Sequence, residues 1–337
     1  MNVLVVFGGE SFEHEVSVIT GCLVSSLIKE DYNVYPLYIN KNKELFYIEN
    51  CSIENFRNNK LGKKVEFVNK GIKTKLFNYK MDIAIICNHG INGEDGMIKG
   101  ILDFYNIPSV GSSLISSAVN MDKYYSYCVL KENNINVVDT AFITKDNLSH
   151  NIEYPIILKP ATLGSSIGIE VCFNEEEYLK KVNESLKYDK KIVVQKYLED
   201  IEEINISLYR NKKGIEISKT ELVEKHEEIY SYDDKYNKNI LKKRTFINNK
   251  LVEELALKAY ELFDLSGIVR IDFILHNDVV YLNEINIIPG SLSYYLYDKK
   301  FKDVIKELIS KELFNKVTQR NITYKSNIIY YDYNMKK

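Results

Sequence analysis

Residues 3–28 read VLVVFGGESFEHEVSVITGCLVSSLI, an apolar run, a glycine pair and a second apolar segment. Val3 to Phe7 is continuously apolar, Gly8-Gly9 interrupts the run, and Val16 to Ile28 has apolar residues at helical spacing. This order predicts a strand, a tight turn and a helix. We therefore expect an α/β domain at the start of the chain.

A second strand–turn–helix unit follows further along. Met81 to Cys87 is apolar apart from Asp82, NHGINGEDG (88–96) supplies turn residues, and Met97 to Tyr105 has an apolar helical face. Both predicted strands end in polar loops. Because open α/β sheets bind ligands at such strand ends, we expect these loops to border a site.

After Gly111 the sequence changes to short strands and turns, which predicts an α+β second half. Asn211 to Gly214 joins two alternating segments and predicts a hairpin. A helix is expected from about Lys250 to Phe263, followed by a second hairpin formed by GIVRIDFIL (267–275) and VVYLNEIN (279–286).

Composition and charge exclude several classes of protein. The chain has 337 residues, is 45% hydrophobic and 27% charged, and carries a net charge of -2, so no basic excess predicts a nucleic-acid partner. The five cysteines include no CxxC motif and favour a reduced cytoplasmic protein. No apolar stretch approaches membrane-spanning length, and the first residues lack signal-peptide character.

The second hairpin has a polar face. Residues two apart on a strand share a face, so Arg270 lies beside Asp272, and Glu284 lies beside Asn286 on the returning strand. If the two faces coincide, three oxygen donors converge, which suits magnesium held partly by phosphates. A solvated face with a salt bridge explains the same residues, and the hairpin alone leaves both interpretations open.

The stretch ILKPATLGSSIGI (157–169) is a candidate phosphate loop. Lys159 ends an apolar strand, and small residues follow: Gly164, Ser165, Ser166 and Gly168. Small residues let backbone N–H groups approach phosphate oxygens, and the lysine adds charge. The loop matches neither Walker A nor GxGxxG, and a plain turn between strands is the alternative interpretation.

Taken together, the motifs resemble those of the D-alanine–D-alanine ligase family of the ATP-grasp superfamily. The matching segments, in order, are GGESFEHEVS (8–17), HGINGEDG (89–96), IPSVGSS with SAVNMDK (107–123), KPATLGSSIGI (159–169), Lys235-Tyr236 after YSYDD, RIDF (270–273) and NEINIIPG (283–290). The resemblance implies a Rossmann-like α/β N-terminal domain with a parallel sheet (1–115) and an ATP-grasp module (116–325). Its two α+β subdomains are expected at 116–198 and 199–325.

The resemblance also implies an ATP and metal site. The residues that match ATP contacts are Lys123, Lys159, Gly164, Ser165, Ser166, Gln195, Lys196, Tyr197, Leu198, Glu203 and Lys235. Glu202 is an alternative to Glu203 at the ribose. Asp272, Glu284 and Asn286 match the ligands of two magnesium ions, with manganese as an alternative metal.

The implied reaction joins two D-alanines through an acyl phosphate, for peptidoglycan precursor synthesis in the cytoplasm. Catalytic residues of the family match Glu15, Ser165, Tyr236, Arg270 and Gly290. Glu15 would hold the ammonium group of the first substrate, and the N–H of Gly290 would complete an oxyanion site. His89 and Tyr295 would face substrate, although a loop-stabilising role for His89 is equally open. The resemblance further implies a homodimer.

Three positions depart from the family pattern. Leu292, Tyr295 and Asp298 stand where the family carries Thr, Ser and Pro, and that Ser binds the carboxylate of the second substrate. A different acceptor, such as D-serine or another small amino acid, is therefore an alternative to D-alanine. A non-catalytic ATP-binding paralogue is a third hypothesis.

Overall fold

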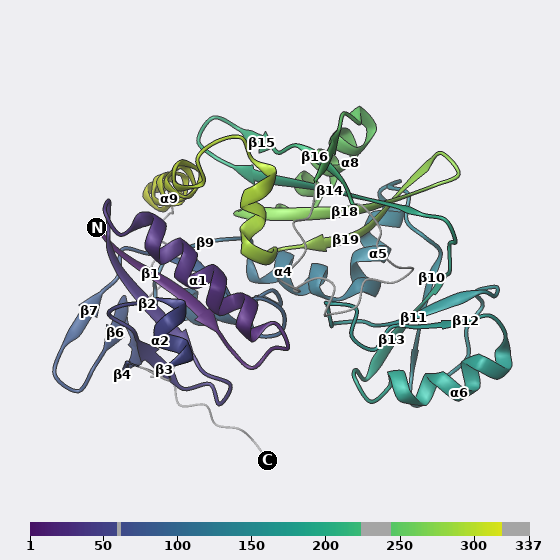
Figure 1. Ribbon diagram of the computed structural model, residues 1–337, viewed down its shortest axis with the longest axis horizontal. Coiled ribbons are helices and arrows are strands. Elements are labelled where there is room, and N and C mark those ends of the chain that lie inside the picture. The colour runs from purple at the N-terminus through teal and green to yellow at the C-terminus, as the bar shows by residue number, and fades with distance from the viewer. Residues whose placement is uncertain (59–61, 224–243, 319–337) are drawn as a thin grey trace, which may run out of the picture.

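The computed structural model describes residues 1–58, 62–223 and 244–318, with side chains described as far as residue 314. Its first region is built on a mixed sheet flanked by helices (Figure 1). The strand order is β4(Lys63–Lys64)-β3(Leu45–Tyr47)-β2(Asn33–Ile39)-β1(Asn2–Gly8)-β8(Ile83–Ile86)-β9(Ser109–Val110). The last four of these strands are parallel, as predicted, and the two at the other edge are antiparallel. The helices are α1(His14–Ile28), α2(Ile53–Arg57) and α3(Met97–Phe104), and a small sheet is formed by β5(Glu66–Val68), β6(Gly71–Lys73) and β7(Asn78–Lys80).

The opening strand–turn–helix unit forms as predicted. Val3 to Phe7 are completely buried, as expected for a strand in the middle of a sheet covered on both faces. Helix α1 packs so closely on β1 that a Cβ on Gly21 would lie 2.2 Å from the Phe7 ring. This packing fixes the start of α1 beside the loop that follows β1.

Two helices, α4(Leu114–Met121) and α5(Lys123–Glu132), lead into the middle region. The prediction after Gly111 named short strands further along the chain and missed these two helices, because polar and aromatic residues mask the helical periodicity of LISSAVNMDKYYSYCVLKE. Asp122 caps α5 by accepting hydrogen bonds from the N–H groups of Tyr124 and Tyr125. Lys123 is the first residue of α5, so this cap fixes the position of Lys123.

The middle region has a separate core. Its antiparallel sheet has the order β10(Thr140–Thr144)-β13(Lys191–Lys196)-β11(Ile156–Pro160)-β12(Glu170–Cys172) and is covered by α6(Glu175–Ser185). Ile156, Leu158, Val182, Ile192 and Val194 are among its fully buried residues. Figure 1 shows this part as a lobe set apart from the other two sheets.

The third sheet carries the predicted hairpins. Its order is β17(Thr245–Ile247)-β16(Thr220–Val223)-β14(Glu202–Arg210)-β18(Ile268–His276)-β19(Val279–Asn286), and β15(Ile215–Ile217) pairs with β14. The predicted helix is α8(Lys250–Leu262); the turn η1(Gly290–Leu296) and helix α9(Phe301–Thr318) complete the described chain.

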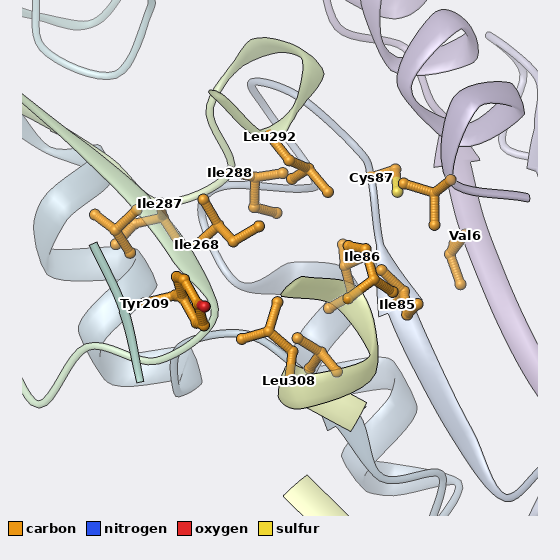
Figure 2. Packing of buried hydrophobic residues seen from close by; sticks show 14 of the residues in the cluster. Val6, Ile85, Ile86, Cys87, Tyr209, Ile268, Ile287, Ile288, Leu292 and Leu308 are labelled. Atoms are coloured by element: carbon orange, nitrogen blue, oxygen red, sulfur yellow. The ribbon is translucent and has the colours of Figure 1, made fainter. Parts of the chain in front are cut away.

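The first and third sheets share an apolar core. Figure 2 shows Ile85 and Ile86 of β8 near Ile268 of β18, Ile288 after β19 and Leu308 of α9. Because this junction is continuous buried hydrocarbon, it holds the loops of the N-terminal region against the end of β19.

Candidate active site

A cavity of about 400 Å³ lies where the three regions meet. Its walls come from the loops after β1 and β8, the segment 163–165, the third sheet and η1. Both predicted polar loops thus border the same cavity, through Glu13 on one side and His89, Gly90 and Glu94 on the other.

A row of four polar residues crosses the cavity side of the third sheet. Glu221 of β16 lies opposite Asn205 of β14, Asn205 opposite Asp272 of β18, and Asp272 opposite Glu284 of β19. All four line the cavity, since cross-strand partners point to the same face of a sheet. The predicted convergence of Asp272, Glu284 and Asn286 on one face is therefore observed, and sequence reasoning missed Asn205 and Glu221.

Each carboxylate of this row has its own cation. Glu284 lies 3.1 Å from the Nζ of Lys123, Asp272 receives hydrogen bonds of 2.6 and 2.7 Å from Arg270, and Glu221 is paired with Arg244. Burial opposes the charge of Arg270, but Asp272 outweighs it and raises the pKa of the guanidinium. The hairpin thus has the salt bridge expected for a solvated face, and the same face also lines a large cavity.

The oxygen donors of the β18–β19 hairpin fit magnesium. Asp272 and Glu284 supply carboxylates, and Asn286, whose amide nitrogen donates to Asp272 over 2.9 Å, supplies an amide oxygen. Over the described ranges, no three His, Cys, Asp or Glu side chains gather as a metal site. Two carboxylates and an amide suit a magnesium ion that keeps further positions for water and phosphate oxygens.

The segment 164–168 forms a tight loop over one side of the cavity. Ser165, Ser166 and Gly168 have φ of 57°, 58° and 71°, and Gly164 and Ser165 line the cavity. The hydroxyl of Ser165 donates to the carboxylate of Glu13, which joins this loop to the loop after β1. The loop also lies near Lys123, whose Nζ donates to the carbonyl of Leu163 over 2.6 Å.

Lys159 is a half-buried cation near the same wall. Its Nζ lies 3.4 Å from the Oδ1 of Asn283, beside Glu284. Burial lowers the pKa of Lys159 to about 8, against the opposing effect of Glu284. A phosphate nearby would stabilise the charged form of this ammonium group and raise its pKa again.

The residues predicted to hold adenine lie at the end of β13. Gln195 donates its amide hydrogen to Thr140 over 2.8 Å, Lys196 donates to the carbonyl of Tyr154 over 2.9 Å, and the N–H of Tyr197 donates to the carbonyl of Pro155. Leu198 follows and is half-buried. Between the two candidates for the ribose, Glu203 lines the cavity and Glu202 is exposed.

The prediction for Glu15 has to be corrected. Its side chain is 62% exposed and forms an ion pair of 2.9 Å with Lys41, whereas Glu13, two residues earlier, lines the cavity. The reason is the helix start: α1 begins at His14, so Glu15 lies in its first turn and points to solvent. Glu13 still belongs to the preceding loop and faces the site.

His89 supports the turn at Gly290. Its Nδ1 donates to the carbonyl of Ile288 over 2.7 Å, and its Nε2 lies 2.8 Å from the hydroxyl of Thr20. Thr20 also accepts from the N–H of Ser291 over 3.2 Å. Both ring nitrogens of His89 therefore contact the protein, which corresponds to the loop-stabilising alternative; burial lowers its pKa and keeps the ring neutral.

Glu94 is a half-buried acid of the loop after β8, where the resemblance places it with His89 on the substrate side and leaves a loop-stabilising hydrogen bond equally open. It accepts from the N–H of Gly90 over 3.1 Å. Burial and the neighbouring Glu13 raise the pKa of Glu94 to about 8. Its contact with Gly90 lies within its own loop, and Glu94 also lines the cavity, so both alternatives stay open.

Only one of the three departures from the family pattern reaches the cavity. Tyr295 lines it, and the guanidinium of Arg244 lies 3.5 Å from the centre of the Tyr295 ring. Leu292 is buried in the apolar core of Figure 2, and Asp298 is a 77% exposed partner of Lys219. Gly290 lines the cavity as expected, while Lys235 and Tyr236 lie outside the described residues.

Known proteins share this architecture. A sequence profile of the D-ala D-ala ligase N-terminus matches residues 2–112, and one of the C-terminus matches residues 122–311. A D-alanine–D-alanine ligase from Thermosipho melanesiensis is 33% identical across 98% of both chains, and one from Borreliella burgdorferi strain ZS7 is 33% identical over 91% of this chain and 94% of its own.

Solved structures agree. The crystal structure of the D-alanine–D-alanine ligase from Helicobacter pylori has a TM-score of 0.75 and 28% identity, covering 92% of this chain and 98% of its own. VanG, a D-Ala:D-Ser ligase from Enterococcus faecalis, shares the fold with a TM-score of 0.80 at 24% identity, covering 92% of this chain and 99% of its own.

The fold is thus that of the ATP-grasp ligases. Within it, the chain belongs to the D-alanine–D-alanine ligase family. In the part of the chain that the structure describes, no helix is both long and apolar enough to cross a bilayer.

Proposed function

We propose that this protein uses ATP to join two D-alanines into D-alanyl-D-alanine, a peptidoglycan precursor, through an acyl-phosphate intermediate. The observation that carries the proposal is the convergence of Lys123, Arg270, Asp272 and Glu284 on one cavity that the loop of Ser165 also lines. Such clustered charge suits phosphoryl transfer, which depends on positioning and on neutralising negative charge.

ATP would bind between the middle and third sheets. Lys123, Lys159 and the N–H groups of residues 164–168 would contact the phosphates, residues 195–198 the adenine, and Glu203 the ribose. The closeness of Lys159 to Lys123 supports this role, because two half-buried cations favour a polyanion.

Asp272, Glu284 and Asn286 would hold magnesium, or manganese in its place. Bound there, the metal would neutralise phosphate charge during transfer. On ATP binding, Lys123 would exchange part of its contact with Glu284 for phosphate oxygens.

The first D-alanine would place its ammonium group at Glu13, where the Ser165 hydroxyl already donates to the carboxylate. Its own carboxylate would attack the γ-phosphorus, forming the acyl phosphate and releasing ADP. The amine of the second amino acid, after losing a proton, would attack the acyl carbon, and phosphate would leave. Arg270 and the N–H of Gly290 would stabilise the oxyanion of this step.

Tyr295 favours a second class of acceptor as an alternative to D-alanine. Because a bulky side chain lines the cavity where the family carries a serine, D-serine or another small amino acid is an alternative acceptor. The D-Ala:D-Ser ligase among the structural neighbours has the same fold. A non-catalytic paralogue is disfavoured by the intact set of Arg270, Asp272, Glu284 and Asn286.

Three finer expectations belong to this proposal: a Rossmann-like N-terminal domain, a cytoplasmic location and a homodimer. The parallel strands β2-β1-β8-β9 support the first, and ATP supply supports the second. Sedimentation of the full chain, alone and with ATP, tests the third. The function itself is tested by D-alanine-dependent ADP release with identification of the product by mass.

A further inference from the structure

One carboxylate–cation pair of the polar row has no role in the proposed function. Glu221 and Arg244 lie on β16 and just before β17, at the edge of the sheet away from β19. The register Glu221–Asn205–Asp272–Glu284 places two strand intervals between Glu221 and Asp272. This third pair therefore stands apart from the wall assigned to metal and phosphate.

Arg244 is held rigidly in the cavity wall. Glu221, which is only 6% exposed, engages one end of its guanidinium, and the ring of Tyr295 covers one face at 3.5 Å. An arginine fixed by a buried carboxylate and an aromatic ring is pre-organised, so its remaining N–H groups can bind a planar anion at low entropic cost. The side chain of Arg244 keeps 32% exposure, which leaves it accessible to a ligand.

The reaction requires such a group. The carboxylate of the donor amino acid is consumed, but the acceptor keeps its carboxylate from binding to product. Among the described cavity-lining residues, the lysine and arginine side chains are Lys123, Arg244 and Arg270. Lys123 and Arg270 lie on the wall assigned to metal and phosphate. Arg244 stands apart from that wall, and its pair with Glu221 engages one end of the guanidinium, so Arg244 is the cation best placed for a second carboxylate.

We propose that Arg244 binds the carboxylate of the acceptor amino acid, with Glu221 and Tyr295 as the residues that position it. The inference rests on the proposed ligase function and names the acceptor as a small amino acid with a free α-carboxylate. Tyr295, Arg270 and Gly290 line the same cavity, so the acceptor would sit next to the oxyanion site at Gly290.

The test compares D-alanine with D-alaninamide as acceptors. D-alaninamide has no carboxylate, so it can accept but cannot donate. Wild type is expected to prefer D-alanine, and Arg244→Gln is expected to lose about 10- to 100-fold of that preference through a higher KM for D-alanine as acceptor. Formation of the acyl phosphate, trapped with hydroxylamine, should be unchanged in this variant.

Two further variants separate binding from a general structural effect. Arg244→Lys should restore part of the preference, because it returns the charge without the planar stack. Arg210→Gln is the matched control, since it removes another arginine placed over a tyrosine, 5.9 Å from the ring of Tyr260, away from the cavity lining. Its acceptor preference should equal that of wild type.

The outcomes distinguish the two claims. If wild type forms product and Arg244→Gln prefers D-alanine over D-alaninamide as strongly as wild type does, the proposed role of Arg244 is wrong. The ligase function is then unaffected. If wild type forms no product with D-alanine, the proposed function fails first, and this inference fails with it.

Discussion

Asp272 lies directly opposite Glu284 in the β18–β19 ladder, and each carboxylate faces the cavity with a separate cation. Two acids at this spacing would repel one another strongly without those partners. Arg270 and Lys123 neutralise the pair in the absence of metal and nucleotide. Under the proposed function, metal and phosphate would take over contacts that Asp272 and Glu284 make with Arg270 and Lys123 in this structure.

The first prediction concerns metal affinity. Asp272→Asn should raise the magnesium concentration for half-maximal ADP release by about tenfold or more, because it removes one of two anionic donors. The measurement is a magnesium titration at fixed ATP. Asp298→Asn is the control, since Asp298 is exposed and pairs with Lys219 outside the cavity. An equal magnesium requirement in both variants would contradict the assigned metal site.

The second prediction separates two glutamates of one loop. Glu13→Gln should lower kcat/KM for D-alanine by about 30-fold, equivalent to about 2 kcal/mol, because it removes the anionic partner of the substrate ammonium group. Glu15→Gln should leave this value unchanged, because Glu15 is exposed and pairs with Lys41. Steady-state kinetics of both variants measures the two losses. A large loss in Glu15→Gln with none in Glu13→Gln would support the original prediction for Glu15.

The third prediction concerns the hydrogen bonds that hold the turn at Gly290. Thr20→Val removes the acceptor for the N–H of Ser291 and the partner of His89. We expect kcat to fall about tenfold with little change in KM for ATP, since a displaced oxyanion donor affects the transition state most. Thr20→Ser should recover the rate, and Ser185→Ala, a buried hydroxyl change in α6, serves as the control. An equal loss in Thr20→Ser would point to packing alone.

The fourth prediction is a pH dependence of ATP binding. In the free protein Lys159 has a pKa of about 8, below its ordinary 10.5, and bound phosphate would raise it again. ATP affinity from this ammonium group is then fully present below pH 8 and falls by up to about tenfold per pH unit above it. Calorimetric titration between pH 7 and 9 measures this slope. Lys159→Met should bind ATP more weakly, and its ATP affinity should depend less on pH. An unchanged slope of affinity against pH in this variant would exclude Lys159 as the source of the pH dependence.

The sequence predicted those parts of the site that depend on local periodicity. Arg270, Asp272, Glu284 and Asn286 share a face because strand side chains alternate, and a short polar turn sets the hairpin register. The strand–turn–helix units at 3–28 and 81–105 formed for the same reason. Their boundaries moved by one or two residues, within the ordinary variation of element ends.

The parts that sequence could not supply depend on long-range approach or on one helix boundary. Glu13 and Glu15 differ only in which side of the start of α1 they occupy, and neither has a distinguishing local signal. The bond between Glu13 and Ser165 joins residues 152 positions apart. The pairing of Arg244 with Glu221 and Tyr295 requires the sheet order and the turn at Gly290 together, which periodicity does not encode.

The most direct test of the central claim is product formation by the full chain with magnesium, ATP and D-alanine. We predict D-alanyl-D-alanine, identified by mass, formed in equal amounts with ADP and phosphate and lost when magnesium is removed. ATP binding without any D-alanine-dependent ADP release would contradict the claim that this cavity is a ligase active site.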